Sequence, residues 1–334
     1  MKYCSILLLS LVLAYGVMAQ QPGNIKPGDQ LILKNIPAIP VATGEAVRKY
    51  TESRSAGHVD WVPGKREMLV STRFGNTPQL HYLSMPMGAR KQITFFDEPV
   101  SGATFEPVSG NYFIFSRDAG GNEFGQLYRY DMKSGNITLL TDGGRSQNGN
   151  IRWNNSRTKI SFTSTKRNGT DRDVYVMNPL DPATTSMVCE VKGGGWAVTD
   201  WAPDDRKLIL QESLSVNEAN LYVYDMETKT RKPVGPVSKK EQVVNSGGRF
   251  SKDGKYIFFV TDADNEYRRL ARMNADGTDL KIITPGLKWD IGSTDMNEEG
   301  TKILFTVSEA GITRVYLLDV ATLKYEELPG MPTG

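Results

Sequence analysis

Apolar and polar positions repeat along most of this chain in units of 44 to 49 residues. Each unit opens with a bulky residue, continues through a polar turn into an apolar strand, and reaches a second strand about twenty residues later. A turn and a third strand then close the unit. A period of this length is typical of one blade of a β-propeller. The opening residues, called anchors below, are Trp61, Phe105, Trp153, Trp201, Phe250 and Met296.

The residue types in each unit fit antiparallel strands joined by tight turns. Segment 201–207 supplies a Pro-Asp-Asp turn before the apolar residues 208–210, and segment 250–255 supplies an Asp-Gly turn before 256–259. Pro, Asp and Gly suit turns, whereas β-branched and aromatic residues suit buried strands. With a fourth strand formed around the anchor, each unit predicts one four-stranded antiparallel blade. Second strands are expected at 80–83, 127–131, 174–177, 221–225, 270–273 and 315–319.

The predicted fold is therefore an all-β β-propeller, with six blades visible between about residues 58 and 329 of the domain 58–334. A stack of β-sandwiches is the alternative, but sandwiches do not repeat a shared anchor, turn and strand order at this spacing. Either six blades close on themselves, or they are part of a seven-bladed ring, which we expect. Six blades of seven leave two unpaired edges, which favour a homo-oligomer.

The N-terminal region is predicted to direct export. Lys2 precedes an apolar run from Ile6 to Val17, and small residues follow up to Ala19, so residues 1–19 read as a cleaved signal peptide. An uncleaved anchor is the alternative. We expect a periplasmic or secreted protein with no membrane attachment after cleavage. Residues 20–57 are expected to form an arm, in which 47–55 has strand character and supplies a ring-closing strand.

Composition excludes several classes of partner and cofactor. The 40 basic and 38 acidic residues give no field of a single sign, so a nucleic-acid partner is not expected. Only Cys189 remains after signal removal, so no intramolecular disulfide forms, and we expect that thiol to be small and buried. The two histidines, His58 and His81, are too few for a histidine metal cluster. No metal and no cofactor are predicted.

Several loops resemble those of a known family. Residues 117–124 read Arg-Asp-Ala-Gly-Gly-Asn-Glu-Phe and lead into the strand 126–131, and similar motifs lie at 192–196 and 264–271. These motifs resemble the propeller of bacterial prolyl oligopeptidase family serine peptidases, of the dipeptidyl-peptidase and acylaminoacyl-peptidase type. Propellers of the TolB type share the aromatic, Pro and Asp-Gly-Lys turn pattern.

The resemblance implies that the propeller gates peptide access to an α/β-hydrolase domain that carries a Ser, Asp and His triad. That domain is missing from this chain. A nucleophile elbow needs Gly-x-Ser-x-Gly, and residues 144–148 lack the closing glycine. We therefore expect the chain to be inactive alone, with the peptide substrate as partner through the missing domain. The alternative function is a stand-alone TolB-like periplasmic scaffold that binds a protein or ligand.

Three glutamates recur in Asn-Glu loops, namely Glu123, Glu218 and Glu266. Such loops gather at one face of a propeller, so their carboxylates, with Arg117 and Asp118, are candidate binding residues on its rim. They would hold the cationic amino group of a peptide. The alternative is that each glutamate caps a turn or pairs with a neighbouring arginine.

Two tryptophans lie away from the anchor positions. Trp196 and Trp289 are the better surface candidates, whereas repetition of the anchor residues at one position predicts that they pack between blades. Residues 262–266 carry oxygen ligands but lack the glycine and distal glutamate of a calcium loop, so we expect a turn there.

Overall fold

A computed structural model describes residues 23–28, 31–100, 102–235 and 242–332. The chain divides into two compact units, Met1–Ser55 and Ala56–Gly334. The predicted signal peptide lies outside the described residues. Within the described residues, no helix is long and apolar enough to cross a membrane.

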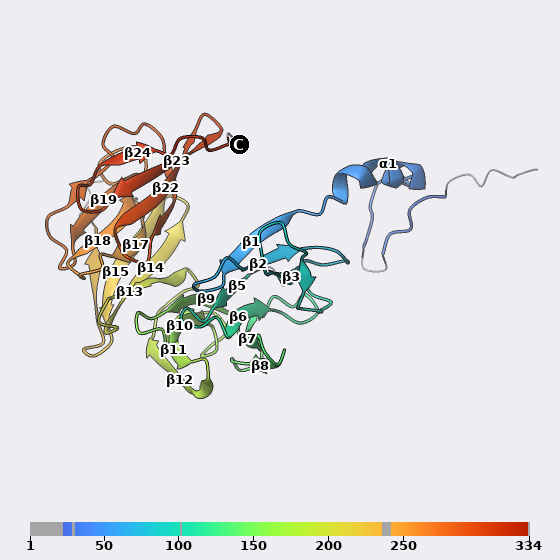
Figure 1. The fold of residues 1–334 in the computed structure, drawn as a ribbon, viewed down its shortest axis with the longest axis horizontal. Helices are drawn as coiled ribbons and strands as arrows, with labels where there is room; N and C mark the ends of the chain where they lie inside the picture. The colour runs from blue at the N-terminus through green and yellow to red at the C-terminus, as the bar shows by residue number, and fades with distance from the viewer. Residues whose placement is uncertain (1–22, 29–30, 101, 236–241, 333–334) are drawn as a thin grey trace, which may run out of the picture. The chain divides into compact units, whose positions relative to one another are not determined.

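The second unit contains six four-stranded antiparallel sheets that follow one another along the chain as the blades of a β-propeller (Figure 1). Each sheet is formed by four consecutive strands, which confirms the predicted fold class. Blade 1 comprises β1 (Ala56–Trp61), β2 (Met68–Thr72), β3 (Gln79–Leu83) and β4 (Lys91–Gln92). Blade 2 comprises β5 (Ala103–Phe105), β6 (Tyr112–Arg117), β7 (Gln126–Asp131) and β8 (Ile137–Leu139). Blade 3 comprises β9 (Asn148–Trp153), β10 (Ile160–Ser164), β11 (Asp173–Asn178) and β12 (Asp181–Cys189).

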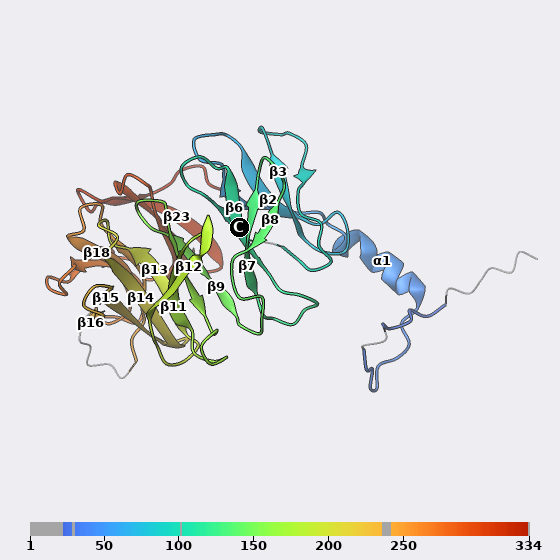
Figure 2. The same ribbon diagram turned by 90° about the horizontal axis from the view of Figure 1, so that it is seen from below.

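The remaining blades repeat this order. The second view shows the neighbouring strands of blade 4 side by side (Figure 2). Blade 4 comprises β13 (Trp196–Trp201), β14 (Lys207–Ser215), β15 (Glu218–Asp225) and β16 (Thr230–Val234). Blade 5 comprises β17 (Asn245–Phe250), β18 (Tyr256–Thr261), β19 (Arg269–Asn274) and β20 (Lys281–Ile282). Blade 6 comprises β21 (Ile291–Met296), β22 (Lys302–Glu309), β23 (Ile312–Asp319) and β24 (Tyr325–Glu327).

The hydrophobic core lies between the blades. Five clusters of buried side chains join blade 1 to 2, 2 to 3, 3 to 4, 4 to 5 and 5 to 6. In blade 2, for example, Phe113 packs toward blade 1 while the next residue, Ile114, packs toward blade 3. This follows from the pleat of a strand, in which consecutive side chains point to opposite faces.

Most anchors pack between blades as predicted, with one exception. Phe105, Trp201 and Phe250 are 2%, 4% and 6% exposed, but Trp61 is 51% exposed. The packing prediction is therefore wrong for Trp61. The physical reason is that Trp61 belongs to the first blade, and no described residues form a core on the side of that blade away from blade 2.

The predicted strand at residues 47–55 is wrong. Residues Val41–Thr51 form the helix α1, which begins after Pro40 and carries an ion pair between Arg48 and Glu52 at 3.5 Å. Val47 and Tyr50 suggested a strand, but the intervening residues are good helix formers. No residue of α1 is buried.

Candidate binding site at the channel mouth

The innermost strand of each blade places one polar residue immediately before its anchor. Five of these six residues line hollows at the channel mouth with their neighbours, and the sixth, Arg152, interacts electrostatically with Arg249, Asp200 and Asp295. Burial lowers the pKa of Arg152, and Arg249 lowers it further. The inner ring therefore carries both signs of charge. Its members in blade order are Asp60, Thr104, Arg152, Asp200, Arg249 and Asp295.

Two of these aspartates tie their blade to the next one. The Asp60 carboxylate accepts the backbone N–H of Phe105 at 2.8 Å, and Asp200 accepts that of Phe250 at 2.8 Å. Asp200 also lies 3.6 Å from the Arg249 guanidinium. Burial raises the pKa of Asp200, and Arg249 opposes that rise. By contrast, the Asp295 carboxylate accepts no hydrogen bond from the described residues.

The ring opens into two hollows of about 760 and 260 Å³ that share residues 295–298 of blade 6. The larger hollow is lined by blades 1, 2, 3 and 6, with the exposed indole of Trp61 beside Asp60, Lys65 and Arg66. Tryptophan is enriched among the residues that contribute most of the binding energy at protein interfaces.

Hydrogen bonds between turns of separate blades stabilise the channel mouth. Asp205 of blade 4 accepts the backbone N–H groups of Asn155 and Ser156 in blade 3, at 2.7 and 2.9 Å. Arg157 donates to the carbonyl of Pro107 in blade 2 at 2.8 Å and to Glu298 of blade 6 at 3.3 Å. The turn after β9 therefore contacts three other blades, which fixes the width of the mouth.

The predicted rim residues of blade 2 make local contacts. Arg117 pairs with Glu98 at 3.0 Å and lies over the ring of Phe96, and its side chain is 19% exposed. Asp118 accepts the backbone N–H of Glu123 at 3.0 Å, which closes their own loop. These contacts give Arg117 and Asp118 a structural role within blade 2.

Glu123, Glu218 and Glu266 lie in the loop after β6, at the start of β15 and in the loop after β18. Glu266 donates its backbone N–H to Asn265 at 2.7 Å. No hydrogen bond or ion pair between described residues joins the three glutamates to one another. A shared binding role for them therefore stays a prediction.

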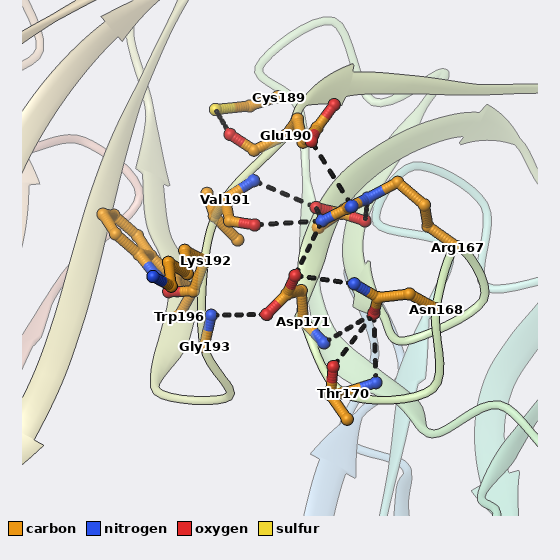
Figure 3. A network of polar contacts seen from close by, with 11 residues as sticks. Arg167, Asn168, Thr170, Asp171, Cys189, Glu190, Val191, Lys192, Gly193 and Trp196 are labelled. Atoms are coloured by element: carbon orange, nitrogen blue, oxygen red, sulfur yellow. Dashed lines mark hydrogen bonds and ion pairs between the residues drawn. The ribbon is translucent and has the colours of Figure 1, made fainter.

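Close to β11, a polar network fixes the path of the chain from blade 3 to blade 4 (Figure 3). Arg167 pairs with Asp173 at 2.7 Å and with Asp171 at 3.0 Å, and also with Glu190 at 3.3 Å. Asp173 is fully buried and accepts the backbone N–H of Val191 at 2.9 Å. The hydrogen bond to Asp173 is the main cause that raises the pKa of Arg167. We interpret this network as structural, because its charges are already paired.

Sequence reasoning did not identify this network or the inner ring. The sequence does contain a pattern that indicates the inner ring, because the residue before the anchor is charged in five of the six repeats. Asp171 and Asp173 lie four and six residues after Arg167, but Glu190 lies 23 residues away, so no single local motif indicates the whole network.

Three further residues can now be placed. Trp196 is 5% exposed, so its prediction as a surface residue is wrong: it packs in the core between blades 3 and 4 and lies under the Arg231 guanidinium. Trp289 is 40% exposed. Cys189 is buried as predicted, and burial raises the pKa of its thiol.

Among the described residues, no group of three or more His, Cys, Asp or Glu side chains is placed to hold a metal ion. His58 lies 5.4 Å from the Trp61 ring, whereas His81 is buried in blade 1. Residues 262–266 form a turn, as predicted.

No family model matches this sequence. The Tol-Pal system protein TolB of Roseobacter denitrificans is 30% identical over 83 residues, which cover 25% of this chain and 18% of that protein. The alignment thus spans less than a fifth of the length of this relative.

Two solved structures share the fold. TolB from Acinetobacter baumannii aligns with a TM-score of 0.53 at 16% identity, over 90% of this chain and 73% of its own. A structure from an analysis of two prolyl endopeptidases aligns with a TM-score of 0.64 at 12% identity, over 85% of this chain and 43% of its own. The propeller therefore resembles both TolB and prolyl endopeptidases.

Proposed function

We propose that this chain is a non-catalytic β-propeller of the TolB kind, which binds another protein at its channel mouth outside the cytoplasm. The observation that carries the proposal is the hollow of about 760 Å³ beside the half-exposed Trp61 indole. Aromatic residues at the centre of a contact surface commonly carry most of the binding energy. The mixed charges around Trp61 supply a polar rim that sets specificity.

The alignment with TolB supports a protein rather than a small molecule as the ligand. The printed name of that relative assigns it to a Tol-Pal system, so the Pal component of such a system is the first partner to test. The export signal predicted at residues 1–19 supports a location outside the cytoplasm. A nucleic-acid partner stays disfavoured by a net charge of +2.

Binding of a purified Pal protein to residues 20–334 tests the proposal, with a biosensor as the readout. Trp61→Ala is expected to weaken binding by about tenfold or more, as for a central aromatic residue. Trp289→Ala is the matched control, because this second tryptophan is 40% exposed and lies outside the hollow. Absence of binding, or equal loss in both variants, would refute the proposed site.

A second candidate is the propeller of an exported prolyl oligopeptidase family peptidase, which filters peptides for a hydrolase domain. The motifs of residues 117–131 favour it, and the structural likeness to a prolyl endopeptidase supports it. In this candidate Glu123, Glu218 and Glu266 hold the free amino group of the peptide.

Short peptides with a free or an acetylated N-terminus distinguish the two candidates. The peptidase candidate predicts that acetylation weakens binding to residues 20–334, and that Glu266→Gln removes the preference for the free amine. The Tol-Pal candidate predicts no difference between the two peptides. Hydrolysis of either peptide by this chain would contradict both candidates.

A further inference from the structure

A hollow of about 590 Å³ lies between the outer strands of blades 1 and 2 and is called the side groove below. It is bounded by β3 and β4 of blade 1 and by the turns that follow β5 and β7 of blade 2. Its apolar lining residues Val62, Ile93 and Met132 belong to the core between these two blades. The core therefore holds the floor of the side groove in place.

The charged residues of the side groove are mostly basic. Three exposed lysines, Lys65, Lys91 and Lys133, line it against a single acid, Glu67. The Glu67 carboxylate already accepts the hydroxyl of Tyr82 and lies 3.7 Å from the Lys65 ammonium. Lys91 and Lys133 form no ion pair with any described residue. The side groove therefore carries two ammonium groups without a counterion.

The same hollow recurs between blades 4 and 5, where its charges are balanced. That groove has a volume of about 470 Å³ and is lined by two lysines, Lys207 and Lys232, and by two aspartates, Asp225 and Asp276. The repeat thus provides an internal comparison for the surplus of positive charge between blades 1 and 2.

The difference between the two grooves can be assigned to one position. Lys91 and Lys232 are equivalent, because each lies in the outermost strand of its blade opposite the same position of the third strand. Lys133 and Asp276 are also equivalent, because each lies two residues after the end of the third strand. Hydrogen bonds from Thr278 lower the pKa of Asp276, and the charge of Lys232 lowers it further. The lysine of blade 4 thus has a carboxylate as its neighbour, whereas the lysine of blade 1 has another lysine.

Aromatic and hydrogen-bonding groups adjoin the two free lysines. Phe95 lines the side groove and is 76% exposed. The ring of Tyr130 stacks on Phe113 at 4.8 Å, and its hydroxyl forms no hydrogen bond with a described residue. The side groove therefore offers a ligand an apolar surface and a free hydroxyl donor beside the ammonium groups.

We propose that the side groove binds an acidic peptide segment of a partner protein, with a carboxylate placed between Lys91 and Lys133. This carboxylate would take the place that Asp276 occupies between blades 5 and 4. Side chains alternate along an extended peptide, so acidic residues can reach the lysines while apolar residues pack on the floor and on Phe95. The side groove differs from the channel mouth, although Lys65 lines both hollows.

A displayed library of random short peptides, selected on immobilised residues 20–334, tests the proposal. Peptides that combine Asp or Glu with apolar residues are expected to be enriched. Fluorescence anisotropy then gives the affinity of the enriched peptides. Binding should weaken as salt rises from about 0.1 to about 1 M, because the Debye length falls from about 10 to about 3 Å.

Lys133→Asp tests the position of the peptide. The change copies the aspartate that blade 5 carries at the equivalent position, so the fold should tolerate it and Lys91 gains an internal partner. Binding of the acidic peptides is expected to weaken by about tenfold or more, because a rim charge is reversed. Lys166→Asp is the matched control, since it makes the same charge change at an exposed lysine outside the side groove. It should bind like the wild type.

Trp61→Ala separates this site from the channel mouth, because Trp61 lines only the larger hollow there. Peptide binding should survive this change whether or not the binding proposed at the channel mouth exists. A selection that enriches no acidic peptides would overturn the proposal. So would an equal loss of affinity in Lys133→Asp and Lys166→Asp, or a loss in Trp61→Ala as large as that in Lys133→Asp. Circular dichroism confirms that each variant is folded.

Discussion

The carboxylate of Asp200 accepts the backbone N–H of Phe250 at 2.8 Å, and this bond helps to join the inner strands of blades 4 and 5. The same carboxylate lies 3.6 Å from Arg249, in a setting where burial raises its pKa. Removing it leaves a buried N–H without its acceptor and a guanidinium without its counterion.

Asp200→Ala is therefore expected to lower the free energy of unfolding by about 2 kcal/mol, the cost of unsatisfied buried groups. Urea denaturation followed by tryptophan fluorescence measures it. Glu227→Ala is the control, because Glu227 is an exposed carboxylate in the same blade. If both variants lose equal stability, the bond between blades 4 and 5 contributes nothing specific.

Gly195 gives a second prediction, which concerns close packing rather than charge. A Cβ atom at this position would clash with the backbone carbonyl of Ser213, at the point where Ser213 donates its N–H to Gly195 at 2.9 Å. Gly195→Ala is expected to cost about 1–3 kcal/mol, since the long hairpin of β14 and β15 must shift.

The neighbouring glycine provides the control for that experiment. A Cβ at Gly194 would meet only the Thr170 carbonyl at 3.8 Å, an ordinary contact. Gly194→Ala should change the thermal midpoint little or even raise it, because alanine restricts the unfolded chain. Equal midpoints for the two variants would contradict the predicted clash.

The blades could be predicted because the residues that define each repeat lie close together in the sequence. Each anchor, its Pro-Asp or Asp-Gly turn and the strand after it lie within about a dozen residues, so the repeat is legible in one sequence. The exposure of Trp61 was not predictable in this way. The exposure of Trp61 depends on whether another blade packs against the face of blade 1 that points away from blade 2. No residue near Trp61 in the sequence indicates whether it does.

The candidate site was less predictable than the fold. The inner ring from Asp60 to Asp295 is spread over more than two hundred residues, and only the alignment of repeats brings its members together. Trp196 was misjudged because its sequence position lies outside the anchor series, although it begins β13 and is buried between two blades. It contacts Arg231 and Tyr222, which lie 35 and 26 residues further along the chain, and packs with core residues of blade 3.

Arg167 provides a third prediction. It is the charged partner of the fully buried Asp173, which it contacts at 2.7 Å. Arg167→Met keeps most of the side-chain volume but leaves Asp173 without its counterion, so a loss of about 3 kcal/mol is expected. Chemical denaturation measures the loss, and Arg206→Met, at an exposed arginine, is the control. If Arg167→Met lost less free energy of unfolding than the control variant, solvent would have to reach Asp173.

The stability of the propeller should also fall at high pH, partly through Tyr112. Burial raises the pKa of Tyr112 to about 12 from an ordinary value of 10.0. Because the folded-state pKa is the higher one, the contribution of this group is complete below pH 10 and is lost as the pH rises toward 12. At pH 11 the loss amounts to about 1 kcal/mol.

Tyr112→Phe removes this ionisation, so its free energy of unfolding should fall less steeply than that of the wild type between pH 9 and pH 11. Urea denaturation at several pH values measures the two slopes. Tyr50→Phe is the control, since Tyr50 is 74% exposed and its replacement should leave the slope unchanged. A Tyr112→Phe slope equal to that of the wild type would mean that Tyr112 ionises as easily in the folded protein as in the unfolded chain.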